Sequence, residues 1–185
     1  MNNNVPFNVY GIGINHPRDW QIIVNPNKTF TFNEGFVKID HMTKGKTAAA
    51  SLAIRWAMMK DDIAVDDYVL ELEKEFKKNE KKSRNKERYR LVDKTKIHLN
   101  GNDAFILENE CISNHSLYRM FGKDERLTVL QCMFYSQETK RMIVASITTH
   151  GKVLIKDKDF YLQILHSLHE TLTDSSVKSQ QTKIS

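Results

Sequence analysis

The stretch SLAIRWAMM, residues 51–59, decides which fold the chain adopts. Apolar and small or polar residues alternate along it, and a period of two indicates a half-buried β-strand. One face would carry the larger apolar side chains, namely Leu52, Ile54, Trp56 and Met58, and the other would carry Ala53, Arg55 and Ala57. A helix is the alternative, because TAAA precedes the stretch and Ala, Leu and Met are strong helix formers. We favour the strand, since alternation accounts for Arg55 among apolar neighbours.

The first forty residues predict a series of short antiparallel strands. Residues 8–15 alternate, residues 20–24 form a second apolar run, and Asn33-Glu34-Gly35 separates TFTF from FVKID. Between the first two runs, His16-Pro17-Arg18-Asp19 combines residue types found in catalytic loops. We interpret it as a turn, because Pro fixes φ and Asp bonds its own backbone, and no second catalytic constellation accompanies it.

Two amphipathic helices are expected. Within residues 61–82, an apolar stripe recurs at steps of three and four, at Val65, Val69, Leu72 and Phe76. Aspartates at 61, 62, 66 and 67 would cap its start, and lysines crowd its end, as the helix dipole favours. Residues 156–172 predict the second helix, with Asp157 or Asp159 as its cap.

Two β-hairpins lie between the helices. Asn100-Gly101 is a strong hairpin turn signal within residues 94–112. Residues 126–149 form the second hairpin, whose first arm is apolar on both faces and therefore central, and whose polar loop from Ser136 to Arg141 we expect to be exposed. Strand runs with few helices predict an α+β fold on a single antiparallel sheet. The expected core includes Ile14, Trp20, Ile54, Leu130 and Ile147. We expect one domain over residues 1–173 and a disordered tail over 174–185.

Composition narrows the class of protein. The 185 residues are 40% hydrophobic and 28% charged, with no apolar run of membrane-spanning length and no signal-peptide pattern at the start. Cys111 and Cys132 lie in apolar runs and are expected to be buried free thiols. These features favour a cytoplasmic protein.

The order of these elements resembles the Mog1/PsbP-like family over residues 8–172. The resemblance lies in the strand–turn–strand GIGINHPRDWQIIV with its Pro-x-x-Trp turn, in SLAIRWAMM leading to an acidic-capped helix, and in the closing FYLQILHSLHETL helix. It implies an antiparallel sheet packed between helices, an α/β/α sandwich. Members bind a small GTPase, support a photosynthetic assembly or are bacterial lipoproteins, without a shared catalytic motif. No functional residue is carried over, because the matching positions are packing positions.

Motifs for chemistry are weak. DHMTKGKT, residues 40–47, ends like a phosphate-binding loop, but Asp40 replaces the first required glycine and a strand follows. Of seven histidines, only His166 and His169 have helical spacing, and no ligand set is complete. No exposed nucleophile motif occurs. We therefore expect no enzyme, no cofactor and no metal, although a hydrolase or nucleotide-handling enzyme of another type remains a third hypothesis.

The basic segment, residues 74–90, is the one feature with a functional pattern. It contains nine lysines and arginines against three glutamates, a net charge of +6, so the rest of the chain carries −1 of the total of +5. The candidate partner- or anion-binding residues are Lys77, Lys78, Lys81, Lys82, Arg84, Lys86, Arg88 and Arg90. Our leading hypothesis is a non-enzymatic binding or assembly module that contacts a protein partner through its sheet surface or this segment. The alternative is a nucleic-acid-binding accessory protein, with Tyr89 stacking a base. A solvated helix end followed by a charged loop is the plain structural interpretation.

Overall fold

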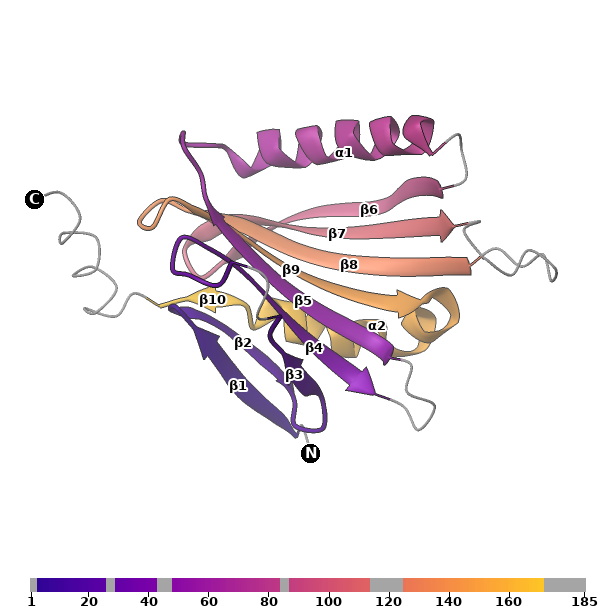
Figure 1. Ribbon diagram of the computed structural model, residues 1–185, viewed down its shortest axis with the longest axis horizontal. Helices are drawn as coiled ribbons and strands as arrows, with labels where there is room; N and C mark the ends of the chain where they lie inside the picture. Colours follow the sequence, from indigo (N-terminus) through magenta and orange to yellow (C-terminus); the bar gives the residue numbers. More distant parts are fainter. Residues whose placement is uncertain (1–2, 26–28, 43–47, 84–86, 114–124, 172–185) are drawn as a thin grey trace, which may run out of the picture.

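The computed structural model describes residues 3–25, 29–42, 48–83, 87–113 and 125–171. Within them, a seven-stranded sheet has the order β3-β4-β5-β9-β8-β7-β6, and a three-stranded sheet has the order β1-β2-β10 (Figure 1). All pairings are antiparallel. The strands are β1 (Asn4–Val9), β2 (Ile12–Pro17), β3 (Gln21–Ile23), β4 (Glu34–Met42), β5 (Ala48–Met58), β6 (Glu87–Leu99), β7 (Asn102–Ser113), β8 (Glu125–Ser136), β9 (Arg141–His150) and β10 (His169–Glu170). The helices are α1 (Val65–Lys82) and α2 (Gly151–His166). The α+β prediction is confirmed, whereas the small second sheet was not foreseen.

Strand β5 confirms the interpretation of residues 51–59 as a strand. It pairs with β4 on one side and with β9 on the other, so it lies inside the large sheet. Leu52, Ile54 and Trp56 are buried, as the alternation predicts, and only Met58 departs from it, with 38% of its surface exposed. All five expected core residues are buried as well.

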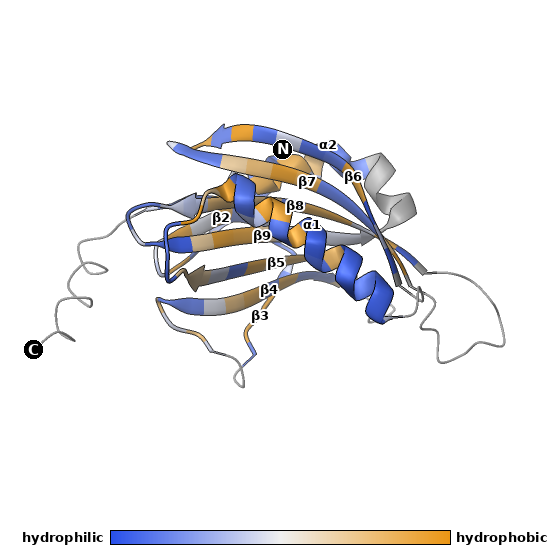
Figure 2. Cartoon of the chain, turned by 90° about the horizontal axis from the view of Figure 1, so that it is seen from above, coloured by the Kyte–Doolittle hydropathy of each residue, from blue (hydrophilic) through white to orange (hydrophobic). Residues whose placement is uncertain are grey.

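The two helices lie on opposite faces of the large sheet. Val65 and Val69 of α1 pack against Phe105, Leu107 and Met133, which alternate along β7 and β8 with side chains that point the other way. Those other side chains form the main core with α2 and β2; its sheet and helix members include Ile12, Ile14, Ile106, Leu130, Cys132, Phe134, Ile164 and Leu165. Figure 2 looks onto α1, whose last turns are strongly hydrophilic. The predicted sheet between helices is therefore confirmed.

The N-terminal strands differ in detail from the prediction. Residues 8–15 are not one strand, because Tyr10 and Gly11 adopt positive φ (50° and 81°) and form the turn between β1 and β2. His16 and Pro17 belong to β2, and the turn predicted at residues 16–19 comes down to Arg18 and Asp19, closed by the Trp20 amide donating to the Pro17 carbonyl at 3.1 Å. The structural interpretation of this stretch therefore holds, with the turn shifted by two residues.

Gly35 is in strand β4 and not in the predicted turn. A Cβ on this residue would lie 2.0 Å from Cζ2 of Trp56, so the indole of the neighbouring strand occupies the space that a side chain would need. The requirement for glycine here comes from packing across the sheet. Sequence reasoning assigned it to a turn, because Asn-Glu-Gly is also a common turn pattern.

Both helices begin elsewhere than expected. Helix α1 starts at Val65, its N-cap residue Ala64 has no side-chain cap, and Asp62 instead accepts from Tyr135 Oη at 2.8 Å and from Lys140 Nζ at 2.7 Å. Helix α2 starts at Gly151, earlier than expected, and Asp157 lies at a kink within it, where the backbone is not helical (φ −120°, ψ 16°). It ends at His166, and His169 lies in β10, so the two histidines do not share a helix.

The loop from Ser136 to Arg141 is not simply exposed, contrary to the prediction. Arg141 is completely buried and joins both sheets. Its guanidinium donates to the Tyr10 carbonyl at 3.0 Å and to the Phe32 carbonyl at 2.9 Å, and it pairs with the buried carboxylate of Glu170. Thr139 adds a hydroxyl bond to Glu170 at 2.9 Å. Polar residues in a loop can face solvent or bind a buried partner such as Glu170, and the sequence pattern alone does not show which of the two occurs.

Three other sequence predictions cannot be followed further in the structure. Lys46 of the loop at residues 40–47 and the expected tail at 174–185 lie outside the described residues. The single domain over 1–173 stays a prediction. Among the described residues, no helix is long and apolar enough to cross a membrane.

Replacing Arg141 with Gln should lower the free energy of unfolding by about 3–5 kcal/mol, because it leaves the Glu170 carboxylate buried without its cation. Urea denaturation of both proteins measures the change. Lys140→Ala, one residue away, removes only an exposed ion pair and should leave the unfolding midpoint almost unchanged. Equal midpoints for R141Q and the wild type would contradict the structural role given to Arg141.

Candidate protein-binding surface

The described residues of the basic segment lie on two different elements and do not form one patch. Lys77, Lys78, Lys81 and Lys82 are exposed on the last turns of α1, and Arg88 and Arg90 are exposed on β6. Arg84 and Lys86 lie outside the described residues. Residues 87–90 are therefore strand and not the charged loop of the plain interpretation.

Tyr89 holds the segment to the sheet. Its ring stacks on Phe76 of α1, with ring centroids 5.3 Å apart and planes 5° from parallel. Side chains alternate along a strand, so Arg88 and Arg90 point to the opposite face of the sheet from Tyr89 and α1. One face of the tyrosine ring is thus already covered. This argues against Tyr89 as a residue on which a nucleic-acid base stacks.

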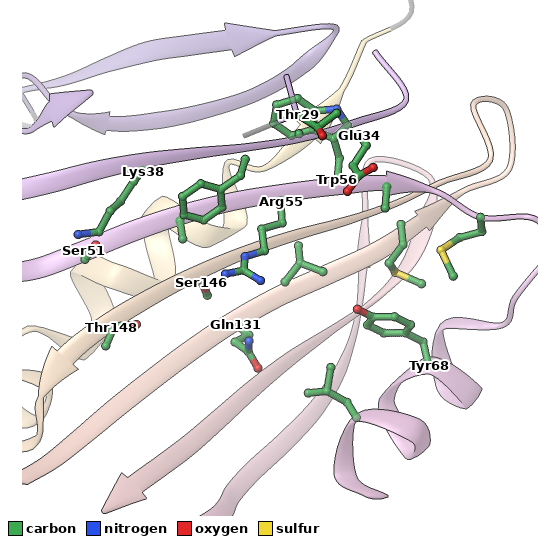
Figure 3. A pocket seen from close by; sticks show the side chains of 18 residues that line it. Thr29, Glu34, Lys38, Ser51, Arg55, Trp56, Tyr68, Gln131, Ser146 and Thr148 are labelled. Carbon is green, nitrogen blue, oxygen red and sulfur yellow. The ribbon is translucent and has the colours of Figure 1, made fainter. Parts of the chain in front are cut away.

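A groove on the α1 face of the large sheet is the more extensive surface, and sequence reasoning did not single it out. Helix α1 packs over β6, β7 and β8 and reaches Val144 of β9, and within the described part of the chain no helix covers the rest of this face over β4, β5 and β9. The groove has a volume of about 980 Å³ and is bounded by Tyr68 and Leu72 of α1 (Figure 3). Its floor is built from alternate residues of three strands, namely Ser51, Ala53, Arg55, Ala57, Gln131, Met142, Val144, Ser146 and Thr148.

Arg55 stands on this floor. Its side chain is exposed, and its guanidinium carbon lies 5.0 Å from the ring centroid of Phe36 on β4, a cation–π contact that supports it. Among the described residues, no carboxylate lies within ion-pair distance of it. An arginine in the interior of a sheet with no acidic partner has donors available for a ligand.

Lys38, which lies on the β4 wall of the groove, is already neutralised by an ion pair. Lys38 Nζ lies 2.8 Å from Oδ2 of Asp40, and the Ser51 hydroxyl donates to Oδ1 of the same carboxylate at 2.5 Å. Asp40 is buried, with 4% of its surface exposed. This cluster ties β4 to β5 and leaves Arg55 as the only ionisable residue on the floor described above.

Gln131 adds a donor beside Arg55. Nδ2 of the buried Asn109 donates to Oε1 of Gln131 at 3.0 Å, so the amide group Nε2 of Gln131 remains as a donor. In Figure 3, Arg55 extends across the floor toward Ser146 and Gln131, with Tyr68 on the opposite wall. These groups can all donate hydrogen bonds to an anion.

The α1 wall continues the groove toward the basic segment. A second hollow of about 340 Å³ shares Tyr68 and Leu72 with the groove and is lined farther along α1 by Lys78 and Lys82. Burial raises the pKa of Tyr68 above its ordinary value, Glu75 raises it further, and Arg55 opposes the rise. Lys78 and Lys82 line the hollow together with Glu71 and Glu75, at helical steps of three and four. Lys77 and Lys81 are on the other side of the helix and point away from the hollow.

Support for chemistry at other places is weak. Among the described residues, no group of three histidines, cysteines, aspartates or glutamates could hold a metal ion. Neither cysteine forms a disulfide, and burial raises the pKa of Cys132 to about 12, so this thiol is not a nucleophile at neutral pH. The carboxylates of Asp62 and Asp103 have lowered pKa values because lysines donate to them, and a lowered pKa does not suit an acid catalyst.

The comparisons with known proteins support the fold. No family model matches the sequence, and no curated protein matches it. The cyanobacterial PsbP (CyanoP) of Synechocystis sp. PCC 6803 superimposes with a TM-score of 0.68 at 11% identity, over 92% of this chain and 94% of that one. PA94 of Pseudomonas aeruginosa, described as a protein of unknown function and putative regulator, gives 0.55 at 15% identity, over 92% and 99%. The chain therefore has the Mog1/PsbP-like fold, as the resemblance in sequence implied.

Replacing Arg55 with Gln should raise the pKa of Tyr68 further, because the cation that favours the phenolate is removed while the burial remains. An NMR titration of tyrosine labelled at Cζ measures this directly. Lys77→Gln removes a cation that points away from the groove and should leave the titration of Tyr68 unchanged. A Tyr68 pKa that falls or stays constant in R55Q would show that Arg55 does not face Tyr68 across the groove.

Proposed function

We propose that the protein is a non-enzymatic binding or assembly module whose partner protein docks in the groove between α1 and β4. The observation that carries this proposal is the uncovered face of β4, β5 and β9 with the exposed Arg55 on its floor. A sheet face of this size beside an amphipathic helix is the kind of surface that a partner segment can cover.

The basic segment contributes through part of its residues. Lys78 and Lys82 border the second hollow, so they can contact a partner that extends from the groove along α1. Lys77, Lys81, Arg88 and Arg90 face elsewhere. The proposal therefore assigns the contact to the groove and to one side of α1, and it treats the other basic residues as solvated charges.

Nucleic-acid binding is the less favoured function. It would need the segment's cations on one surface to follow a phosphate backbone. The described lysines lie on α1, whereas Arg88 and Arg90 lie on β6 and point to the opposite face of the sheet. The stack of Tyr89 on Phe76 also removes one ring face from base contacts. An electrophoretic mobility shift at about 50 mM salt is the sensitive test, because phosphate contacts are strongest there.

Blocking the groove should remove the partner. Ala53→Tyr places a large side chain, one that strands tolerate well, on the floor next to Arg55. Affinity purification from native extract should retrieve a specific protein with the wild type and lose it with A53Y. The double variant Lys77→Glu, Lys81→Glu is the matched control and should still retrieve it.

The outcomes separate the surfaces. Loss of the partner in the Lys77, Lys81 control with retention in A53Y would contradict docking in the groove and assign the contact to the outer side of α1. Circular dichroism melts of each variant confirm that a lost interaction is not a lost fold.

A further inference from the structure

We propose that the groove selects an extended, acidic segment of its partner, with one carboxylate bound by Arg55 and a large apolar side chain two or three residues away. This inference rests on the proposed function and adds the chemistry of the segment that docks. It follows from the charge, the hydrogen-bond donors and the dimensions of the groove.

The charge of the floor favours an acid. Of the described side chains, Arg55 is the only charged one that β5, β8 and β9 contribute to the groove, and Lys38 is neutralised by Asp40. Lys74, which borders the second hollow, pairs with Glu71 at 2.5 Å. Two carboxylates, Glu34 and Glu75, lie at the walls, against Lys78 and Lys82 farther along α1. The uncompensated charge at the centre of the floor is therefore positive.

The polar groups around Arg55 complement a carboxylate. A guanidinium presents paired donors that fit the two oxygens of a carboxylate. The amide nitrogen of Gln131 and the hydroxyls of Ser146 and Tyr68 surround it and can donate as well. The ring of Phe36, the neighbour of Arg55 on β4, contacts the guanidinium and restricts its motion, so less side-chain entropy is lost when an acid binds.

The two ends of the groove differ in polarity. Beyond Arg55, the lining changes to Ala57, Met59, Leu72 and the buried Met142, a mainly apolar end rich in methionine, with Glu34 beside it on β4, where it pairs with Ala57. Thioether side chains adapt to differently shaped apolar partners. Ala57 pairs with Met142 and Arg55 pairs with Val144, so the apolar end begins two strand residues from the arginine.

The dimensions of the floor fit an extended segment. The two sites lie about 7 Å apart at the spacing of a strand, which an extended peptide spans with two residues. From Ser51 to Ala57 the floor is about 20 Å long, enough for roughly six extended residues. The structure thus specifies an acidic residue near the middle of a short segment, with an apolar residue to one side of it.

A displayed library of random peptides of about twelve residues, long enough to cover the floor, tests the inference on the full chain. Peptides that the wild type enriches should carry Asp or Glu two or three positions from Leu, Ile, Met or Phe. In a double-mutant cycle, changing that acid to its amide should weaken binding to the wild type about 10- to 100-fold, the range of a charge-assisted hydrogen bond. The same change should have little effect on binding to R55Q. Lys77→Gln is the control and should behave as the wild type does.

The outcomes distinguish failure of the acidic segment from failure of docking in the groove. Peptides that A53Y no longer binds, but that show no preference for acidic residues, would overturn the inference and leave docking in the groove intact. The absence of any peptide whose binding A53Y removes would overturn both. Binding of a single-stranded RNA that R55Q abolishes would overturn the acidic segment in favour of a phosphate ligand. If R55Q fails to fold, the acid-to-amide change in the peptide, measured on the wild type alone, still decides the question.

Discussion

A cluster of five buried apolar side chains determines which part of the sheet this protein exposes. Val65 and Val69 of α1 pack on Phe105, Leu107 and Met133, and burial of each valine contributes about 1.5–3 kcal/mol. The cluster places α1 over β6, β7 and β8. The stack of Phe76 on Tyr89 extends the contact toward the end of the helix. Because one helix of this width covers only part of a seven-stranded sheet, the same face of β4, β5 and β9 is left as a surface.

The main hydrophobic core lies on the opposite face of the large sheet and stabilises the fold, so the groove face does not need to be fully covered. There the large sheet, α2 and the small sheet share one core, and Arg141 with Glu170 joins the small sheet to the β8–β9 turn. Strand β5 shows the division most clearly: Leu52, Ile54 and Trp56 are buried on the core side, while Ala53, Arg55 and Ala57 line the groove. The fold therefore places its main core on one face, and the proposed function places recognition on the other. The likeness to CyanoP and PA94 concerns this architecture and leaves the partner to be found by experiment.

Sequence reasoning predicted the elements whose signals are local. The alternation in 51–59, the stripe from Val65 to Phe76 and the Asn100-Gly101 turn, with φ of 50° and 86°, are all present. It failed where the reason is tertiary: Gly35 is required by the Trp56 ring, and the buried Arg141 by Glu170. The groove was missed for the same reason, since only the position of α1 shows which alternate residues of β5 remain uncovered. Arg55 was noticed as unusual, and that was the available signal.

The central claim is that the groove face of β4, β5 and β9 is open to solvent. Comparing the reactivity of thiols on the two faces of the large sheet tests it. Ser146 lies on β9 in the groove, and Cys132 lies on the adjacent strand β8, on the core side. In a Cys111→Ala background, the account predicts that a cysteine at position 146 (Ser146→Cys), which is half-buried on the groove side, reacts with a water-soluble thiol reagent in the folded protein. Cys132 should react only after unfolding, because burial raises its pKa to about 12. A cysteine at position 146 as unreactive as Cys132 would show that the face is covered and would contradict the account.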